Sequence, residues 1–487
     1  MKLLSTLYVL FYESLIERGV WVNKIVRGII CILIGLVIWF APIPEGVKPD
    51  AWHLLAVFTA TIAAFILQPV AIGTASIIGL TTVVITGVLK PGQALEGFSN
   101  TVIWLIVAAF MFAKGFIKTG LGRRIAYILM SKFGDSTLKL AYTMSATDFI
   151  VAPFTPSNTA RGGGIVYPIA RSLCTAFGSE PGPTAGKVGK FLIFSSYNSV
   201  IISASVFLTG ASNNVVVMKL TQELFGQTIT WAQWFMACIV PGIVCSILIP
   251  YILYKIYPPE LKNTPEAKEM AYQELISMGS MSRNEKILLL IFTGALILWA
   301  TSSITGVDSA FVALLGLSFM LVTGVLTWDD VLGEKGAWDV LIWMGVLVNM
   351  AAYLAKLGLI TWFAKLVAAQ LVGISWVMVL VLVCIVYTFV HYGFASNTAH
   401  VMALFSAFAI VAVAAGAPVL LTAILLGVFA NTCSTLTHYA CGVSPIFFGS
   451  GYITQSEWWR HGFVLSLVHL VIWLGIGIPW MKVIGIW

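Results

Sequence analysis

Long hydrophobic runs, separated by short polar segments, cover almost the whole chain. A membrane-spanning helix needs about 17 to 25 predominantly apolar residues, and eleven of the runs reach that length. The runs are residues 28–44, 52–68, 71–89, 98–118, 190–222, 231–256, 286–303, 309–327, 337–357, 416–437 and 461–484. The pattern predicts an all-α polytopic membrane protein with eleven transmembrane helices.

Two further apolar stretches, 137–175 and 374–415, each contain a Ser-Asn-Thr tripeptide near the middle. In the first stretch each arm beside the tripeptide reaches only about 22 Å as a helix, whereas the hydrocarbon core is about 30 Å thick. Such short arms favour a re-entrant helical hairpin that enters and leaves on one side. In the second stretch the first arm (374–393) is long enough to cross the bilayer, so its length does not by itself indicate a hairpin. We predict a re-entrant hairpin in each stretch.

The composition supports a membrane protein and argues against other classes. Of the 487 residues, 59% are hydrophobic and 10% are charged, whereas soluble domains carry about 25% charged residues. The net charge of +7 comes mostly from basic residues between the hydrophobic runs, so it reports on membrane topology and not on nucleic-acid binding. The seven cysteines show no CxxC or CxxH spacing, so we predict no disulfide framework, metal site or cofactor.

The basic residues predict how the chain crosses the bilayer. Lys and Arg occur before the first span, after the fourth, after the first hairpin and in a polar segment near 257–286, but the loops near 222–230 and 303–308 contain none. If both hairpins are re-entrant, the basic segments all lie on one side, which the positive-inside rule assigns to the cytoplasm. The N-terminus is then cytoplasmic and the C-terminus outside, and we expect a bacterial inner membrane.

The polar segment divides the chain into two similar halves. Ser157-Asn158-Thr159 and Ser396-Asn397-Thr398 lie 239 positions apart (396 minus 157), the same offset as Gly97 and Gly336. Corresponding spans are separated by an odd number of crossings, so the repeats must be inverted, which is typical of secondary transporters. The predicted organisation is an interfacial segment (1–27), a first spanning helix (28–50), repeat 1 (51–256), a cytoplasmic linker (257–285) and repeat 2 (286–487).

The two tripeptides have the chemistry of an anion site. Ser, Asn and Thr are favoured at helix N-termini, where free backbone N–H groups and the helix dipole attract an anion. Two tips that reach the bilayer centre from opposite sides could each hold one carboxylate of a small di- or tricarboxylate. The alternative is that both tripeptides only cap helices, which explains a third copy at 99–101. The residues assigned to the substrate are Ser157, Asn158, Thr159, Ser396, Asn397 and Thr398.

Each tripeptide is followed by a basic residue at an equivalent position, Arg161 in repeat 1 and His400 in repeat 2. Basic residues inside a membrane protein are costly and usually functional, so we expect both to supply positive charge that compensates the substrate anion. The alternatives are that Arg161 pairs with Asp148 on the other arm, and that His400 is a neutral core histidine.

Polar and helix-breaking residues interrupt two of the spans, at 207–215 and 437–451. Irregular backbone at membrane depth is tolerated only around a cavity or within protein, so we expect both breaks to lie at the substrate site. Loops between separate short spans are the alternative. The residues expected to line the site are Gly210, Ala211, Ser212, Asn214 and Ser444, and those expected to contact the substrate are Cys441 and Gly442.

Four motifs resemble the divalent anion:sodium symporter family: GLGRRIA (120–126), VAPFTPSNTAR (151–161), FLTGASNN (207–214) and GVSPIFFGSGYI (442–453). They look closest to its bacterial citrate–succinate and tartrate–succinate exchangers and to the chloroplast dicarboxylate translocators. The resemblance implies a homodimer with a scaffold domain and an elevator-like transport domain, and it implies that the two tips bind substrate carboxylates.

The chain departs from the family pattern at five positions. Sodium-coupled members have a hydroxyl residue four positions before each tripeptide, where this chain has Pro153 and Tyr392. His438 and Val443 stand where the family usually has Pro, and Cys441 stands where it usually has Thr. The loss of the hydroxyl at Pro153 bears on sodium coupling, and Cys441 and His438 bear on the identity of the substrate.

These features predict a secondary transporter that exchanges di- and tricarboxylates of the succinate, 2-oxoglutarate, malate and citrate class. If Arg161 and His400 replace sodium, the empty carrier would move unpaired cations through the barrier, which favours sodium-independent antiport. A sodium-coupled dicarboxylate symporter is the alternative, because backbone carbonyls alone could bind sodium. We expect no enzyme, since HExxH, GxSxG and clustered carboxylates do not occur. The duplicated hairpins favour alternating access over a passive channel.

Overall fold

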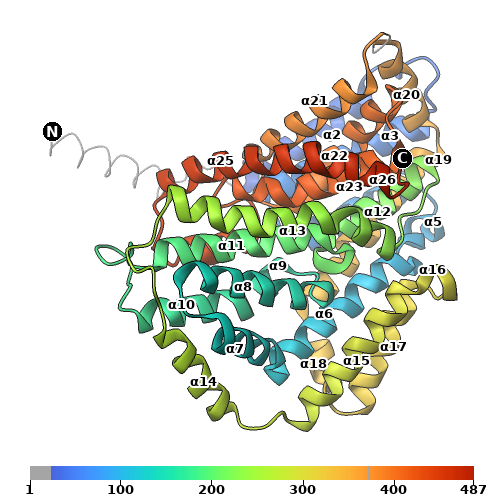
Figure 1. Ribbon diagram of the computed structural model, residues 1–487. Coiled ribbons are helices and arrows are strands. Elements are labelled where there is room, and N and C mark those ends of the chain that lie inside the picture. Colours follow the sequence, from blue (N-terminus) through green and yellow to red (C-terminus); the bar gives the residue numbers. More distant parts are fainter. Residues whose placement is uncertain (1–23, 371–372) are drawn as a thin grey trace. The chain divides into compact units, whose positions relative to one another are not determined.

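The computed structural model describes residues 24–370 and 373–487, and every regular element in these residues is a helix (Figure 1). The predicted interfacial segment 1–27 lies almost entirely outside the described residues. The chain divides into two compact units. The first unit is Met1–Ser99 with Ile342–Trp362, and the second unit is Asn100–Leu341 with Phe363–Trp487. Each unit therefore combines segments from both halves of the sequence.

Close backbone contact holds the first unit together. Its described helices are α2 (Lys24–Phe40), α3 (Pro49–Leu67), α4 (Ile72–Ile85), α5 (Pro91–Leu95) with the turn η1 (Glu96–Ser99), and most of α19 (Lys335–Lys356). A Cβ atom on Gly97 would collide with the carbonyl group of Gly345 on α19, so the backbones can meet only because residue 97 is glycine. The Asn349 side chain then donates to the carbonyl oxygens of Gln93 (2.7 Å) and Ala94 (3.1 Å).

The second unit holds both Ser-Asn-Thr stretches. Its helices from the first half of the chain are α6 (Thr101–Thr119), α7 (Leu121–Phe133), α8 (Thr137–Val151), α9 (Asn158–Arg161), α10 (Tyr167–Ala176), α11 (Gly189–Val206), α12 (Ser212–Phe225) and α13 (Trp231–Ile256). Next come α14 (Glu266–Met278), α15 (Arg283–Ala300), α16 (Ser302–Thr305), α17 (Ser309–Val322), α18 (Trp328–Leu332) and the start of α19. The last group is most of α20 (Leu359–Gln370), α21 (Trp376–Val390), α22 (Asn397–Ala414), α23 (Val419–Thr432), α24 (Ser444–Phe448), α25 (Gln455–Ile472) and α26 (Ile478–Val483).

Helix α11 is the core of the second unit. It packs against α8, α10, α13 and α23, and it is buried on nearly every side (Figure 1). A helix that is surrounded by other helices has no solvent face, so its polar side chains can form hydrogen bonds only within the protein. Ser199 and Ser205 donate back to carbonyl groups one turn earlier in α11, whereas Tyr197 and Ser203 reach other segments of the unit.

Every run that the sequence predicts to span the membrane contains a helix, but fewer helices are long enough to cross alone. Among the described residues, six helices are long and apolar enough, or seven if a bent pair near residue 100 is one span, and two of the six, Trp376–Gly393 and Asn397–Ala414, are the arms of the second predicted hairpin. Three further apolar helices are shorter. The break at 207–211 divides the 190–222 run into α11 and α12. Eleven crossings and the predicted orientation stay predictions.

The linker that we predict as a polar segment contains a helix, α14. It packs on α7 through small buried side chains such as Ala267 and Ala271. The buried Arg124 of α7 donates to the carbonyl oxygens of Met278 (3.3 Å) and Gly279 (2.9 Å), at the C-terminal end of α14. A guanidinium at this position satisfies free carbonyl groups and complements the helix dipole. Arg124 also forms an ion pair with Glu285.

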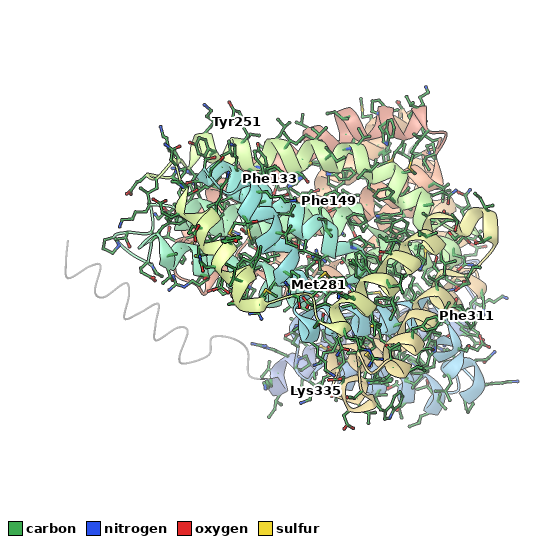
Figure 2. The ribbon with its side chains drawn as sticks, turned by 60° about the horizontal axis from the view of Figure 1, so that its bottom comes forward. Phe133, Phe149, Tyr251, Met281, Phe311 and Lys335 are labelled. Atoms are coloured by element: carbon green, nitrogen blue, oxygen red, sulfur yellow. The ribbon has the colours of Figure 1, made fainter. Side chains whose placement is uncertain are left out.

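Large apolar side chains are exposed on the outer faces of the second unit. Phe133, Tyr251 and Phe311 are labelled examples (Figure 2), and between 45% and 60% of each residue is exposed. Soluble proteins rarely leave extended apolar surface uncovered. Helices that face lipid hydrocarbon require such surface, so the exposed residues fit a membrane protein.

Candidate substrate-binding site

The first Ser-Asn-Thr tripeptide lies at a break between two helices. Helix α8 ends in the turn η2 (Ala152–Phe154), and α9 begins at Asn158 and continues through the π-turn η3 (Gly162–Val166) into α10. Ser157 is the N-cap of α9, because its Oγ accepts a hydrogen bond from the Ala160 N–H (3.1 Å). The N-terminal end of a helix therefore stands at the tip, as predicted from the sequence.

The second tripeptide has the same local geometry. Helix α21 ends in the turn η5 (His391–Gly393), and α22 begins at Asn397. Ser396 is the N-cap, and its Oγ accepts a hydrogen bond from the Ala399 N–H (3.3 Å). We call residues 157–159 the first tip and residues 396–398 the second tip. Helix capping at both tips is confirmed, whereas the re-entrant course of the two stretches stays a prediction.

The first predicted break separates α11 from α12. The turn η4 (Leu208–Gly210) and an extended Ala211 interrupt the helix, and the Ser212 N–H donates to the Pro156 carbonyl (2.9 Å) beside the first tip. Asn214 donates to the carbonyl oxygens of Ala204 (2.7 Å) and Phe207 (2.9 Å). The Asn214 side chain thus satisfies carbonyl groups near the break, as a buried break requires.

The second predicted break lies between α23 and α24. After the turn η6 (Cys433–Thr435) the chain runs without a helix until Ser444. The Ser444 Oγ accepts from the Cys441 N–H (3.2 Å) and lies 2.8 Å from the Tyr197 hydroxyl of α11. A Cβ atom on Gly442 would lie 2.5 Å from the Thr159 Oγ1 atom. The first tip therefore lies directly against the second break, which joins the two repeats.

The amide groups of both tips are oriented by neighbouring side chains. Arg161 donates to the Asn158 Oδ1 atom (3.3 Å), and Ser434 donates to the Asn397 Oδ1 atom (2.7 Å). Because each oxygen is engaged, the amide NH₂ groups of the two asparagines are free to donate, and neither has an acceptor among the described residues. The capped helix ends and the two NH₂ groups form a set of hydrogen-bond donors that suits carboxylates.

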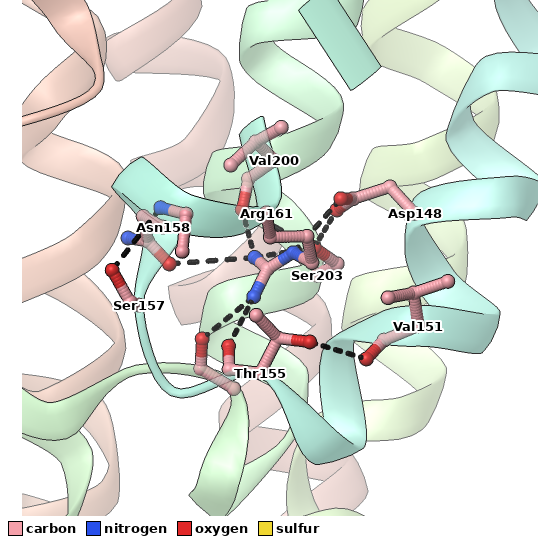
Figure 3. Close-up of polar contacts among 10 residues, drawn as sticks. Asp148, Val151, Thr155, Ser157, Asn158, Arg161, Val200 and Ser203 are labelled. Carbon is pink, nitrogen blue, oxygen red and sulfur yellow. Dashed lines mark hydrogen bonds and ion pairs between the residues drawn. The ribbon is translucent and has the colours of Figure 1, made fainter. Parts of the chain in front are cut away.

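Arg161 is completely buried beneath the first tip, where its guanidinium donates to six acceptors (Figure 3). The acceptors are Asp148 Oδ1 (2.8 Å), Thr155 O (2.7 Å), Gly210 O (2.9 Å), Val200 O (3.0 Å), Ser203 Oγ (3.1 Å) and Asn158 Oδ1 (3.3 Å). The ion pair with Asp148 is the alternative that the sequence left open. Its carboxylate offsets the guanidinium charge, so Arg161 adds no net charge to this cluster, and its role towards a substrate stays a prediction.

His400 occupies the equivalent place in repeat 2 but has different neighbours. It is fully buried, and neither ring nitrogen has a hydrogen-bond partner within the described part of the chain. Its ring lies 4.2 Å from the Tyr387 ring and 4.9 Å from the His391 ring, measured between centroids. Tyr387 stands where the repeat offset places Asp148 (148 + 239 = 387). An aromatic pair thus replaces the ion pair of repeat 1.

The structure adds polar residues that we did not predict. Ser434 orients the second tip, and Tyr197 donates to the Ser434 carbonyl (2.7 Å). Asn431 accepts from Asn213 (3.2 Å) and donates to Asn214 (2.7 Å), which links α23 to the first break. All of these are polar residues within apolar runs, and that placement could have identified them.

Known proteins resemble this chain over almost its full length. A family model described as "Sodium:sulfate symporter transmembrane region" matches residues 22–487. The chain is 45% identical over 465 residues to "Putative malate transporter YflS" of Bacillus subtilis (strain 168), covering 95% of this chain and 97% of the relative. It is 44% identical over 459 residues to "Dicarboxylate transporter 1, chloroplastic" of Spinacia oleracea, covering 94% and 81%. It is 36% identical over 468 residues to "L-tartrate/succinate antiporter" of Escherichia coli O157:H7, covering 92% and 96%.

The fold also resembles a solved transporter. The crystal structure of the Alcanivorax borkumensis YdaH transporter covers 95% of this chain and 98% of its own, with a TM-score of 0.56 and 13% sequence identity. At that identity the likeness concerns the fold alone. The family model and the three relatives extend over nearly the whole sequence. The chain therefore belongs to the divalent anion:sodium symporter family, matched by the sodium:sulfate symporter model, and it is a transporter and not an enzyme.

Proposed function

We propose that this protein exchanges di- and tricarboxylates of the succinate, 2-oxoglutarate, malate and citrate class across a membrane by sodium-independent antiport. The observation that carries the proposal is the pair of equivalent tips in the second unit. Each tip combines a capped helix N-terminus with an asparagine whose amide oxygen is held by a neighbour. Two groups of anion-binding donors suit a ligand with two carboxylates.

The names of the relatives support carboxylates as substrates. Those of the bacterial and plant relatives refer to malate and dicarboxylates, and that of the Escherichia coli relative refers to tartrate and succinate. We assign the substrate to the first tip, the second tip, Cys441 and Gly442, because Gly442 lies against Thr159. Gly210, Ala211, Ser212 and Ser444 line the same site from the two breaks.

The contacts of Arg161 support independence from sodium. Carbonyl and side-chain oxygens from the first tip, α8, α11 and the first break converge on its guanidinium. Oxygen atoms grouped in this way would suit a hard cation, but a covalently attached cation already occupies their centre. The first tip and the first break are therefore held together by Arg161, without a sodium ion from solution.

Obligatory exchange follows if the substrate-free binding site crosses the membrane much more slowly than the substrate-loaded site. Without substrate, the two asparagine NH₂ groups and the two helix ends would cross the membrane without acceptors, and unsatisfied polar groups are costly in that environment. A bound dicarboxylate supplies the acceptors, so the loaded carrier moves more easily. We further propose a homodimer with elevator-type movement, in a bacterial inner membrane with a cytoplasmic N-terminus, on the strength of the family and the inverted repeats.

Transport into liposomes tests the proposal. Purified protein is reconstituted into vesicles that contain succinate, 2-oxoglutarate, citrate or no substrate, and entry of labelled succinate is followed with and without sodium. Antiport predicts entry only into loaded vesicles, at a rate that sodium does not change. Sodium-driven entry into empty vesicles would instead support the alternative, a sodium-coupled dicarboxylate symporter.

Variants of the tips test the site. Asn158→Ala and Asn397→Ala each remove one donor to a carboxylate, and hydrogen bonds to charged groups contribute about 1.5–3 kcal/mol. Each variant should therefore raise the half-saturating succinate concentration about ten- to a hundredfold. Asn100→Ala is the matched control, since Asn100 belongs to the third Ser-Asn-Thr copy, directly before α6. Equal effects of all three substitutions would refute the assignment.

A further inference from the structure

Three buried side chains with metal-ligand chemistry meet at the second tip. They are His391 of η5, His400 of α22 and Cys433 of η6, and each is 0% exposed. One imidazole nitrogen of each histidine and the cysteine Sγ atom all lie within 4.8 Å of one another. The sequence predicts no metal site, because these residues lie far apart along the chain and show no short ligand spacing.

The hydrogen bonds of the cluster leave acceptor atoms free. The His391 Nε2 atom lies 3.0 Å from the Ala440 carbonyl oxygen, so it carries the proton and donates. The Nδ1 atom of His391 and both ring nitrogens of His400 have no partner in residues 24–370 and 373–487. Buried nitrogen atoms without partners are costly, and a bound ion would satisfy the acceptor nitrogens.

We propose that His391, His400 and Cys433 bind one thiophilic d¹⁰ metal ion, Zn²⁺ or Cu⁺. Imidazole and thiolate are the ligands that these ions prefer over the oxygen-binding Mg²⁺ and Ca²⁺. A metal-bound histidine usually donates its second N–H to a carbonyl or carboxylate, which fixes the ring and the ligating nitrogen. The bond from His391 to Ala440 has this arrangement and leaves Nδ1 to bind the ion.

The dimensions of the cluster fit such an ion after small movements. Bonds of about 2.0 Å to nitrogen and about 2.3 Å to sulfur place the ligand atoms of a tetrahedral site about 3.5 Å apart. The observed limit of 4.8 Å therefore requires side-chain shifts of about 1 Å. The Cys433 thiol, which donates to the Ala430 carbonyl (3.3 Å), would lose its proton on binding. With three protein ligands, a fourth position stays open.

Metal content and ligand type can be measured without any transport assay. The full-length protein is purified with an affinity tag that contains no histidine, its Zn²⁺ or Cu⁺ content is measured, and it is titrated with each ion under anaerobic conditions. We expect on the order of one ion per chain and its loss in Cys433→Ser. Cys384→Ser is the matched control, because Cys384 is a buried free cysteine of α21 outside the cluster.

X-ray absorption of the wild-type protein adds a test that does not depend on a variant being folded. A sulfur scatterer at about 2.3 Å together with nitrogen at about 2.0 Å supports the site, and the absorption edge distinguishes Zn²⁺ from Cu⁺. Metal content far below one ion per chain, or equal loss in the two cysteine variants, overturns the inference. The result is independent of the proposed function: exchange without bound metal refutes only the metal site, and bound metal without exchange refutes only the proposed antiport.

Discussion

Replacing Arg161 with methionine is expected to destabilise the second unit by about 3–5 kcal/mol, the cost of removing one partner of a buried ion pair. The structure supports this magnitude, because both side chains of the Arg161–Asp148 pair are 0% exposed. Among the described residues, the buried Asp148 carboxylate then keeps one hydrogen bond, from the Ser203 hydroxyl. It also removes a donor from the carbonyl groups of Thr155 and Gly210.

A second substitution separates the energetic effect of the unpaired Asp148 charge from that of the carbonyl groups that lose their donor. Asp148→Leu in the Arg161→Met background removes the unpaired charge, so the double variant should be more stable than the sum of the single effects, by about 0.5–3 kcal/mol. It should still be less stable than the wild-type protein. The carbonyl oxygens of Thr155 and Gly210 lose their donor in the single and the double variant alike, and a buried acceptor without a partner costs about 1–3 kcal/mol.

The assay is thermal unfolding of purified protein in detergent, followed by tryptophan fluorescence with and without succinate. A ligand that binds only the folded state raises the midpoint. Arg161→Met should lower the midpoint and lose most of the shift with succinate, because Arg161 orients the Asn158 amide of the first tip. The reasoning is refuted if Arg161→Met unfolds at the wild-type midpoint and keeps the full shift.

Arg124→Met is the matched control for this experiment. Arg124 and Glu285 form another buried ion pair of the second unit, with side chains 7% and 3% exposed and the Nε and Oε1 atoms 2.5 Å apart. The pair joins α7 to α15, and in the described part of the chain its hydrogen bonds do not reach either tip. Its loss should lower the midpoint to a similar extent and leave the shift with succinate intact.

Three further predictions follow from single contacts. Ser434→Ala removes the 2.7 Å bond that orients the Asn397 amide and should raise the half-saturating succinate concentration several-fold without loss of maximal exchange rate, as measured in loaded vesicles. Gly442→Ala places a methyl group 2.5 Å from a hydroxyl oxygen of the first tip and should reduce stability by about 1–3 kcal/mol and impair exchange; a fully active, stable variant would show that the tip and the break are not in contact. The ammonium of Lys118, together with hydrogen bonds from Thr327, lowers the pKa of Asp330 to about 2, so the Lys118–Asp330 pair contributes stability above about pH 4 that is lost as the pH falls towards 2. Unfolding midpoints across this range should therefore fall more steeply for the wild-type protein than for Lys118→Ala.

The positions of the helices and their caps follow from local chemistry, and the sequence predicts them well. Ser157 and Ser396 begin helices because the hydroxyl oxygen of each accepts a hydrogen bond from the free N–H three residues later. The hydrophobic runs likewise contain helices throughout. Helix α14 shows where local reasoning fails, because its polar composition resembles a loop and its C-terminal end is held by Arg124 from another helix.

The sequence by itself determined that the chain is an all-helical membrane transporter with duplicated Ser-Asn-Thr tips, since hydropathy, helix capping and the repeat offset all follow from the order of residues along the chain. Only the tertiary structure decided what those tips contact. Asp148 could be named as a partner of Arg161, but the converging carbonyl groups come from segments distant in sequence. The contact of Thr159 with Gly442 and the meeting of His391, His400 and Cys433 likewise depend on packing between helices. Hydropathy specifies which segments are buried but not which side chains meet, because many helix arrangements bury the same apolar surface.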